Sequence, residues 1–419
     1  MIKATRRTWA AGAALFVLGL AANASAQQTV KIGVIYPLSG NAASAGNYSK
    51  MASELGAEIV NNGNPELAKI LPFISAGGGL PGLKGAKIEV VIADNQGTPA
   101  AGANQTLRLI TQEKVAAVIG TYQSGITETA SAIAEKYGIP FLTPESVAAN
   151  LTERGFKWFF RTTPVAGDFA KAYSAFLKEQ KAAGKKVDSI ALVHENTEYG
   201  NSVSSVIADV FKTDGLNVTQ NISYSANSTD VQPQVLQLKE KNPDAAIFIS
   251  YTSDAILYTK TMKELNWKPS ILIADDAGFN DPKYVKEMGS QVEGLISRTS
   301  FAAGKPGSVA VICDELYKKK TGGDGLDDTS GRGLQGFFVL VDAINRAGST
   351  DPAKIQAALM ATDLKKEQMV AGYNGVKFDA KGQNQLASSI VTQMRGGQYL
   401  PVWPKANATA DLVLPYKGW

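Results

Sequence analysis

The chain alternates short, continuously apolar segments with longer segments whose apolar residues recur at helical spacing. In its first half, the apolar segments lie at residues 30–36, 87–93, 115–119 and 140–142. In its second half, the same rhythm returns at residues 189–194, 216–224, 245–250 and 271–274. Strands that are apolar along their whole length are typical of parallel sheets covered by helices on both faces. The pattern therefore predicts two α/β units, each built on a doubly wound parallel sheet.

The remaining segments predict how the two units are connected. The sequence KWFFRTTPVAGD, residues 157–168, is typical of a strand that crosses from one unit to the other. After residue 300 the pattern becomes helical, with a strongly buried helix over residues 334–344, and short strands follow at residues 375–378, 389–394 and 399–403. We expect the helices to return to the first unit and the last strands to join the second. The predicted lobes are residues 27–162 plus 301–372 and residues 163–300 plus 373–419.

The first 26 residues have the layout of a secretory signal peptide. Three basic residues precede an apolar run at residues 9–22, and Ala-Ser-Ala at residues 24–26 is a small-residue cleavage site. The apolar run is too short for a membrane span. The residue directly after the cleavage site is Gln27 and not a cysteine, so no lipid anchor is expected. We therefore expect the signal peptide to occupy residues 1–26 and the mature chain to be periplasmic.

Composition restricts the class of function. Of 42 basic and 38 acidic residues, three basic ones fall in the signal segment, which leaves 39 − 38, or +1. A nearly neutral chain offers no electrostatic attraction to nucleic acid or to an anionic membrane. The single histidine, His194, and the single cysteine, Cys313, leave no paired ligands for zinc. A Ser-His-Asp triad would depend on His194, which more simply makes local hydrogen bonds at a strand end. We expect no enzyme activity, no metal and no cofactor.

Residues 61–85 form a glycine- and proline-rich insertion. Gly77, Gly79 and Gly82 match the letters of a dinucleotide-binding G-x-G-x-x-G motif, but the segment leads into a strand and not into a helix. The insertion joins the end of a helix to the start of a strand, whereas ligands of such sheets bind at the carboxyl ends of the strands. We expect it to lie away from the ligand site.

Polar side chains follow the third and fourth strands of the first unit. The sequence TYQSGITETAS places Tyr122 and Ser124 at the start of a helix, and LTPESV places Glu145, Ser146 and Val147 in a turn. A helix N-terminus presents free N–H groups and a partial positive charge, so it can hold a carboxylate. The alternative for Ser124 is simple capping of its helix, and one serine can do both.

The second unit has polar strand ends of its own, in the sequences HENTEYG, SYTSD and ADDAG. They would bring Tyr199, Tyr251 and either Asp275 or Asp276 toward the same space. Each has a structural alternative, because the tyrosines are as easily packed aromatics and the aspartates can cap the turn that follows. Three such strand ends together favour a ligand cleft between the two units.

Taken in order, these segments resemble the periplasmic solute-binding proteins of ABC transporters, of the leucine/isoleucine/valine-binding type. The markers are VKIGVIYPLSG, IEVVIADNQGTP, VAAVIGTYQSG, IPFLTPES, FFRTTP and EYG, spread over nearly the whole mature chain. The resemblance implies the type I periplasmic binding protein fold, which has two Rossmann-like lobes with parallel sheets joined by three crossover segments. It also implies a monomeric protein with an ABC permease as its membrane partner.

The resemblance assigns roles by motif position. The hydroxyl after the third strand and the turn after the fourth hold the ligand's α-carboxylate in that family, which implies this role for Ser124 and residues 145–147. An acid on the second lobe holds the ammonium group, which implies Asp275, one methylene shorter than the usual glutamate. Tyr122 lies beside Ser124 in the third marker, and Tyr199 and Tyr251 match aromatic wall positions.

Two departures from the family pattern concern the ligand. Val147 stands where leucine binders carry a threonine, and Ala45 stands where they carry a pocket aromatic. We predict a receptor that closes two lobes around a small carboxylate-bearing solute, with an amino acid favoured because Asp275 offers an ammonium partner. The alternatives are an aromatic or aliphatic carboxylate that lacks an amine, and a ligand-sensing module of a regulator.

Overall fold

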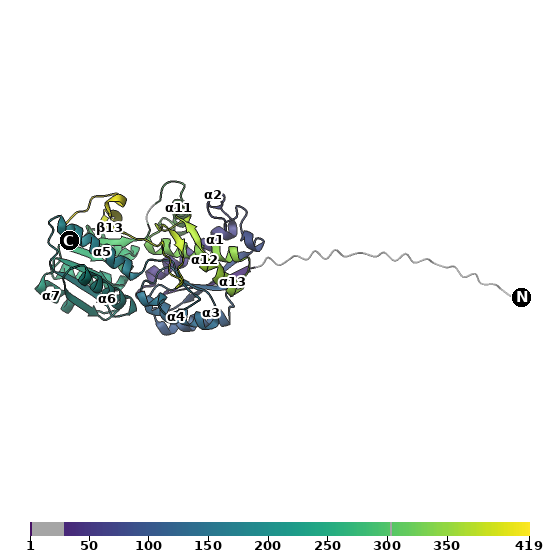
Figure 1. Ribbon diagram of the computed structural model, residues 1–419, viewed down its shortest axis with the longest axis horizontal. Helices are drawn as coiled ribbons and strands as arrows, with labels where there is room; N and C mark the ends of the chain where they lie inside the picture. The colour runs from purple at the N-terminus through teal and green to yellow at the C-terminus, as the bar shows by residue number, and fades with distance from the viewer. Residues whose placement is uncertain (2–28, 302–303) are drawn as a thin grey trace.

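The computed structural model describes residue 1, residues 29–301 and residues 304–419. Apart from Met1, the predicted signal segment lies outside the described residues. Two α/β lobes lie side by side, one carrying α1, α3, α4 and α12 and the other carrying α5, α6 and α7 (Figure 1). Within the described ranges, no helix combines the length and the apolar character needed to cross a membrane.

The first lobe is built on a five-stranded sheet of order β2-β1-β3-β4-β5, and all its neighbouring strands are parallel. The strands are β1 (Thr29–Tyr36), β2 (Lys87–Asp94), β3 (Ala117–Gly120), β4 (Phe141–Thr143) and β5 (Phe159–Arg161). Their carboxyl ends therefore meet at one edge. The parallel sheet predicted from the continuous apolar segments is confirmed.

Helices cover both faces of this sheet. Val34 of β1 packs in one core with Leu334 and Phe337 of α12. Its neighbour Ile35 packs on the opposite face with Leu109 and Ala130, because successive side chains of a strand point to opposite sides. The helices of this lobe are α1 (Ala43–Asn62), α3 (Pro99–Thr111), α4 (Ser124–Tyr137), α11 (Val309–Thr321), α12 (Asp328–Ala347) and α13 (Pro352–Met360).

The second lobe is built on a seven-stranded sheet of order β14-β13-β10-β9-β8-β6-β7. Its parallel part consists of β6 (Ile190–Glu195), β7 (Val218–Tyr224), β8 (Ala245–Ile249), β9 (Ile271–Ala274) and β10 (Ile296–Thr299). The late strands β13 (Ile390–Arg395) and β14 (Gln398–Trp403) add to β10 in antiparallel orientation. The helices are α5 (Ala166–Ala182), α6 (Glu198–Thr213), α7 (Gln232–Lys241), α8 (Thr252–Glu264), α9 (Ala277–Asn280) and α10 (Pro282–Met288).

One predicted strand belongs elsewhere. The segment at residues 375–378 forms β12 (Gly375–Lys377), which pairs with β11 (Asp363–Lys365) in a separate two-stranded sheet and not with the second lobe's sheet. Phe378 then packs edge-on against Phe160 of β5, with ring centroids 5.1 Å apart. The backbone N–H of Asn384 still donates to the carbonyl of Arg161 in β5. The chain therefore stays with β5 beyond residue 372, the predicted boundary, before it crosses to β13.

The insertion at residues 61–85 contains α2 (Pro65–Ala68) and a short turn of helix at Pro81–Leu83. Gly82 N–H donates to Asn345 Oδ1 over 2.7 Å, close to the C-terminal end of α12. The opposite end of that helix contacts the carboxyl end of β10, because Asp328 Oδ1 accepts from Thr299 Oγ1 over 2.6 Å. At 1.5 Å per residue the two ends are about 25 Å apart. The insertion lies away from the carboxyl edge, as predicted.

Candidate functional site

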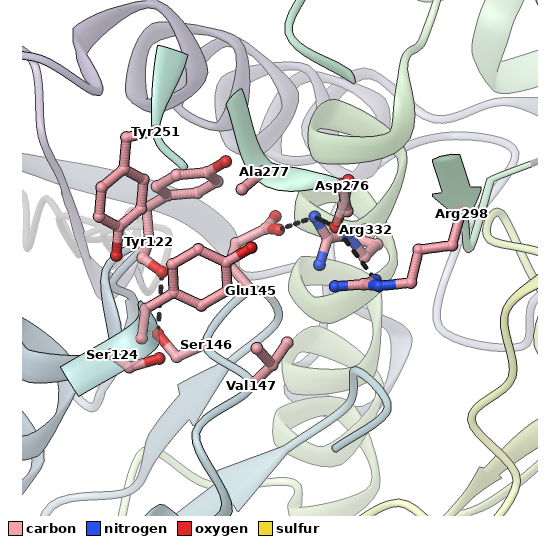
Figure 2. A pocket seen from close by; sticks show the side chains of 11 residues that line it. Tyr122, Ser124, Glu145, Ser146, Val147, Tyr251, Asp276, Ala277, Arg298 and Arg332 are labelled. Carbon is pink, nitrogen blue, oxygen red and sulfur yellow. Dashed lines mark hydrogen bonds and ion pairs between the residues drawn. The ribbon is translucent and has the colours of Figure 1, made fainter. Parts of the chain in front are cut away.

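A pocket lies between the lobes, at the carboxyl ends of strands from both sheets (Figure 2). Its lining residues are Tyr122, Ser124, Glu145, Ser146, Val147, Tyr199, Tyr251, Asp276, Ala277, Arg298 and Arg332. The side chains after β3 and β4, together with Arg332 of α12, come from the first lobe, and the others come from the second. Of the eight predicted site residues, seven line this pocket, and Asp275 does not.

The serines of the first lobe are fixed by hydrogen bonds that join two strand ends. Ser124 is the first residue of α4, and Gln123 occupies the capping position before it. Ser124 Oγ accepts from Ala148 N–H over 3.3 Å, so its hydroxyl joins the helix start to the turn after β4 and does not cap α4. Ser146 donates to the carbonyl of Tyr122 over 3.0 Å (Figure 2).

Three tyrosines from the two lobes form the aromatic wall. The ring of Tyr251 lies 6.0 Å from that of Tyr122 and 5.3 Å from that of Tyr199, measured between centroids. Burial raises the pKa of all three well above its usual range, which keeps their hydroxyl groups neutral. The Tyr122 and Tyr251 hydroxyls are buried and have no hydrogen-bond partner among the described residues. Both side chains line the pocket, so these hydroxyls are available to a ligand.

Asp275 lies in the interior of the second lobe. Its Oδ1 accepts from Tyr173 Oη over 2.7 Å and from Arg298 Nε over 2.9 Å, and its Oδ2 accepts from Tyr199 Oη over 2.9 Å. The prediction that Asp275 faces the ligand is therefore not met. The backbone turns at Asp276, where φ is +47°, and this residue lines the pocket in place of Asp275.

Asp276 joins the two lobes through arginines. Its Oδ2 lies 3.0 Å from Nη2 of Arg332, in the first lobe, and 3.1 Å from Nη1 of Arg298, in the second. Its Oδ1 accepts from Asn280 Nδ2 over 2.9 Å. Burial raises the pKa of Asp276 to about 6, although both arginines favour its ionised form. The ion pair with Arg332 connects the lobes directly at the pocket wall.

Arg332 also binds two acids of its own lobe. Its Nη2 lies 3.1 Å from Glu145 Oε2, and its Nε lies 2.9 Å from Asp328 Oδ2 one helical turn earlier. Arg298 stacks on Phe169 of α5, with its guanidinium carbon 3.3 Å from the ring centroid. The side chains of both arginines are only 2% exposed. Such buried charges require partners.

Neither arginine was predicted as a site residue, and Ala277 was missed as well. Arg332 lies in a segment that was interpreted only as a buried apolar helix, and Arg298 lies in β10, which the apolar pattern did not resolve. For Arg332 the available signal was a charged residue next to the predicted buried helix, because arginine is almost never buried without a partner, whereas the short strand β10 offered no apolar run that could mark Arg298.

A cluster of buried charged side chains adjoins the pocket, and carboxyl groups outnumber guanidinium groups in it. The four carboxyl groups, those of Glu145, Asp275, Asp276 and Asp328, surround two buried arginines, and of these acids only Glu145 and Asp276 line the pocket. Burial raises the pKa of Glu145 well above its usual range. His194 does not line the pocket, and its Nδ1 lies 3.0 Å from the carbonyl of Glu195. Across residues 29–301 and 304–419, no cluster of acidic, histidine or cysteine side chains is suited to a metal ion.

Comparisons with known proteins cover nearly the whole chain. Residues 29–398 match the family model described as periplasmic binding protein. The chain is 32% identical over 410 residues to Leu/Ile/Val-binding protein homolog 7 of Brucella suis, covering 94% of this chain and 96% of the relative. It is 30% identical over 416 residues to homolog 8 of the same species, covering 96% of this chain and 97% of the relative.

Solved structures share the fold. A leucine-binding protein of Thermotoga maritima matches with a TM-score of 0.75 and 24% identity, covering 88% of this chain and 97% of that one. A branched-chain amino-acid binding protein of Streptococcus pneumoniae, in complex with isoleucine, matches with a TM-score of 0.75 and 22% identity. The match covers 93% of this chain and 100% of that one. A solute-binding protein of Rhodopseudomonas palustris, in complex with benzoate, matches with a TM-score of 0.75 and 19% identity. The match covers 91% of this chain and 98% of that one. The same architecture therefore holds ligands with and without an amine.

Proposed function

This chain belongs to the periplasmic binding protein family, and from that premise we propose that it captures an amino acid for an ABC uptake transporter. The ligand is held in the interlobe pocket and is delivered to the transporter's membrane permease. The mature chain acts in the periplasm after residues 1–26 have been removed. Mass spectrometry of the periplasmic fraction is expected to find a chain that starts at Gln27, and an intact Met1 there would contradict export by this route.

The excess of carboxyl groups in the buried cluster beside the pocket is the observation that carries the proposal. Two arginines face four carboxylates, all of them buried. An uncompensated charge in a buried site is costly, so a ligand that brings a positive group is favoured. The ammonium group of an amino acid supplies that charge. A carboxylate without an amine, such as the benzoate held by the Rhodopseudomonas palustris protein, would add a negative charge beside these acids without bringing a positive one.

The start of α4 provides for the other end of an amino acid. A helix leaves the N–H groups of its first turn without intrahelical partners, and its dipole favours an anion there. Ser124 stands at this point and lines the pocket, so its hydroxyl is placed to add a hydrogen bond. We assign the ligand's carboxylate to this position.

Capture works by closure of the lobes. A ligand stabilises the closed form only through contacts with both lobes. In this structure the lobes already touch around the pocket, as when Ala149 N–H donates to Ser202 Oγ over 3.1 Å and Ser44 Oγ donates to Asp281 over 2.7 Å. The lobes are therefore together in this structure, and both of them line the pocket.

A thermal-shift screen tests the proposal. The probes are amino acids and their counterparts without the amine, such as L-leucine with 4-methylpentanoate and L-phenylalanine with 3-phenylpropionate. A ligand that binds only the native state raises the melting temperature. We expect stabilisation by one or more amino acids and none by the matched acids. Greater stabilisation by benzoate or by an amine-free acid would instead support the alternative cargo class.

A further inference from the structure

We propose that Glu145, a first-lobe residue, is the counter-charge for the ligand's ammonium group, in place of an aspartate of the second lobe. This inference rests on the proposed function, because it assigns one end of the amino acid to a particular side chain. It starts from which carboxylates of the pocket wall already have hydrogen-bond donors and which do not.

The carboxylates of both aspartates after β9 already have partners within the protein. Asp275 accepts hydrogen bonds from two tyrosines and an arginine and lies outside the pocket lining. Asp276 has Asn280 on Oδ1, and both arginines lie within 3.1 Å of Oδ2. A ligand ammonium would have to compete with guanidinium groups at either residue.

Glu145 has the opposite situation. It lines the pocket and is 4% exposed, yet neither of its carboxylate oxygens accepts a hydrogen bond from any described residue. Its 3.1 Å contact with Arg332 brings the charges together without hydrogen-bond geometry. Burial raises the pKa of Glu145 well above its usual range, and a cation beside it would favour the ionised form, whose acceptor positions the described residues leave unfilled. An ammonium group, with three N–H donors, matches this unfilled capacity.

The surroundings of Glu145 also suit a cation. Figure 2 shows its carboxylate between the tyrosines on one side and Arg332 on the other. Tyr122 and Tyr251 offer buried hydroxyl oxygens without a partner among the described residues, and aromatic faces that attract cations. A ligand nitrogen held here would meet acceptors from both lobes.

The simpler role for Glu145 would be to neutralise Arg332. That arginine, however, already has Asp328 at 2.9 Å and Asp276 at 3.0 Å, so its charge is compensated without a third acid. Arg332 therefore does not require Glu145 to neutralise its charge. The two roles make different predictions, because a neutralising residue affects stability and a ligand partner affects the choice between ligands.

The assignment also fixes an order of events. Ser124 and Glu145 both belong to the first lobe, so this lobe holds the carboxylate and the ammonium of the ligand while the lobes are apart. Closure then adds the second-lobe tyrosines and forms the contact between Arg332 and Asp276. The first lobe selects the amino acid, and the second lobe encloses it.

Isothermal titration calorimetry of wild type, Glu145→Gln and Asp276→Asn tests the assignment with the two matched probe pairs. We expect Glu145→Gln to weaken binding of L-leucine or L-phenylalanine by at least tenfold and to leave the amine-free acids unchanged or bound more tightly. Asp342→Asn is the matched control, because Asp342 is buried and pairs with Arg346 inside α12. If Glu145→Gln keeps amino-acid affinity within twofold while Asp276→Asn loses it, the inference is wrong and the proposed function stands.

Two further outcomes are decisive. If the wild type prefers the amine-free acids, the proposed function fails and the inference falls with it. Should Glu145→Gln not fold, Glu145→Asp serves in its place, because it keeps the charge but withdraws it by one methylene. This variant is expected to lose amino-acid affinity selectively, whereas equal losses for both members of a probe pair would contradict the inference.

Discussion

Arg332 of the first lobe and Asp276 of the second meet with 3.0 Å between Nη2 and Oδ2, and both side chains are almost fully buried. This ion pair exists only while the lobes are together, because the two residues belong to different lobes. When the lobes separate, both groups regain water. The pair therefore contributes to the balance between the open and closed forms as well as to the pocket wall.

Asp276→Asn is expected to shift the unliganded protein toward the open form. The variant keeps the size of the side chain and removes the charge that Arg332 meets across the cleft. A hydrogen bond to a charged group is worth about 1.5–3 kcal/mol, which here acts on the closed form alone. Small-angle X-ray scattering would detect the change as a larger radius of gyration. Asp342→Asn, whose partner Arg346 lies in the same helix, should leave the radius unchanged.

Ser124→Ala is expected to weaken amino-acid binding by about 0.5–3 kcal/mol, the range for hydrogen bonds to neutral and charged partners. The variant removes the hydroxyl from the start of α4 and leaves the helix N–H groups in place. Calorimetric titration measures the effect. Ser131→Ala, on the same helix but outside the pocket lining, is the control. Equal affinities of Ser124→Ala and wild type would limit Ser124 to joining α4 to the turn after β4.

Gly56→Ala is expected to destabilise the fold by about 1–3 kcal/mol, the usual cost of overpacking. A Cβ at Gly56 of α1 would lie 2.5 Å from the ring of Phe337 of α12, so the helix that carries Arg332 would have to move. Gly167→Ala in α5 is the matched change, because a Cβ there meets nothing within 4 Å, and it should stabilise by up to about 1 kcal/mol. Denaturant unfolding compares the two, and effects of the same sign would contradict this account of the helix contact.

Asp254→Asn is expected to stabilise the protein at neutral pH only. Asp254 is 1% exposed in the first turn of α8, and burial raises its pKa from 3.8 to about 6. Because the folded protein holds this proton more tightly than the unfolded chain does, stability contributed by the group is present below pH 4 and is lost as the pH rises through 6. A two-unit shift corresponds to about 3 kcal/mol.

The free energies of unfolding of Asp254→Asn and wild type should therefore differ by up to about 3 kcal/mol at pH 7.5 and converge near pH 4. Asp188→Asn is the control, since Asp188 lies at the surface in an exposed pair with Lys181, and such pairs contribute little. If Asp254→Asn increases the free energy of unfolding equally at both pH values, ionisation of Asp254 is not the cause.

Local patterns account for what could be predicted from sequence. Strand β8 is apolar from end to end and β1 is mostly apolar, and a buried strand of this kind is visible without knowledge of its neighbours. The residues after β3 and β4 were found for the same reason, because they follow a recognisable strand end. Strand β10 was missed because Ser297, Arg298 and Thr299 interrupt its apolar run. Arg298 is buried there through its pairs with distant aspartates, which no local pattern reports.

Two features of the site depend on tertiary structure. Arg332 reaches the pocket because α12 packs on the first lobe. It lies far along the chain from Glu145, so no spacing in the sequence indicates their contact. The choice between Asp275 and Asp276 depends on a positive φ at Asp276, a conformation that non-glycine residues rarely adopt. A sequence places both carboxylates at the strand end but does not fix which of them faces the cleft.

The interleaved course of the chain has a consequence for how the protein comes to be folded. The sheet of the first lobe is complete by Arg161, yet the part of one face over β3 and β4 is covered only when α12 arrives, and the second sheet gains β13 and β14 only near residue 400. Contacts between such distant segments slow folding much more than they weaken the finished structure. Neither lobe can be finished in the order of synthesis. A polypeptide built in this way can complete neither of its two lobes until almost all of it has been made.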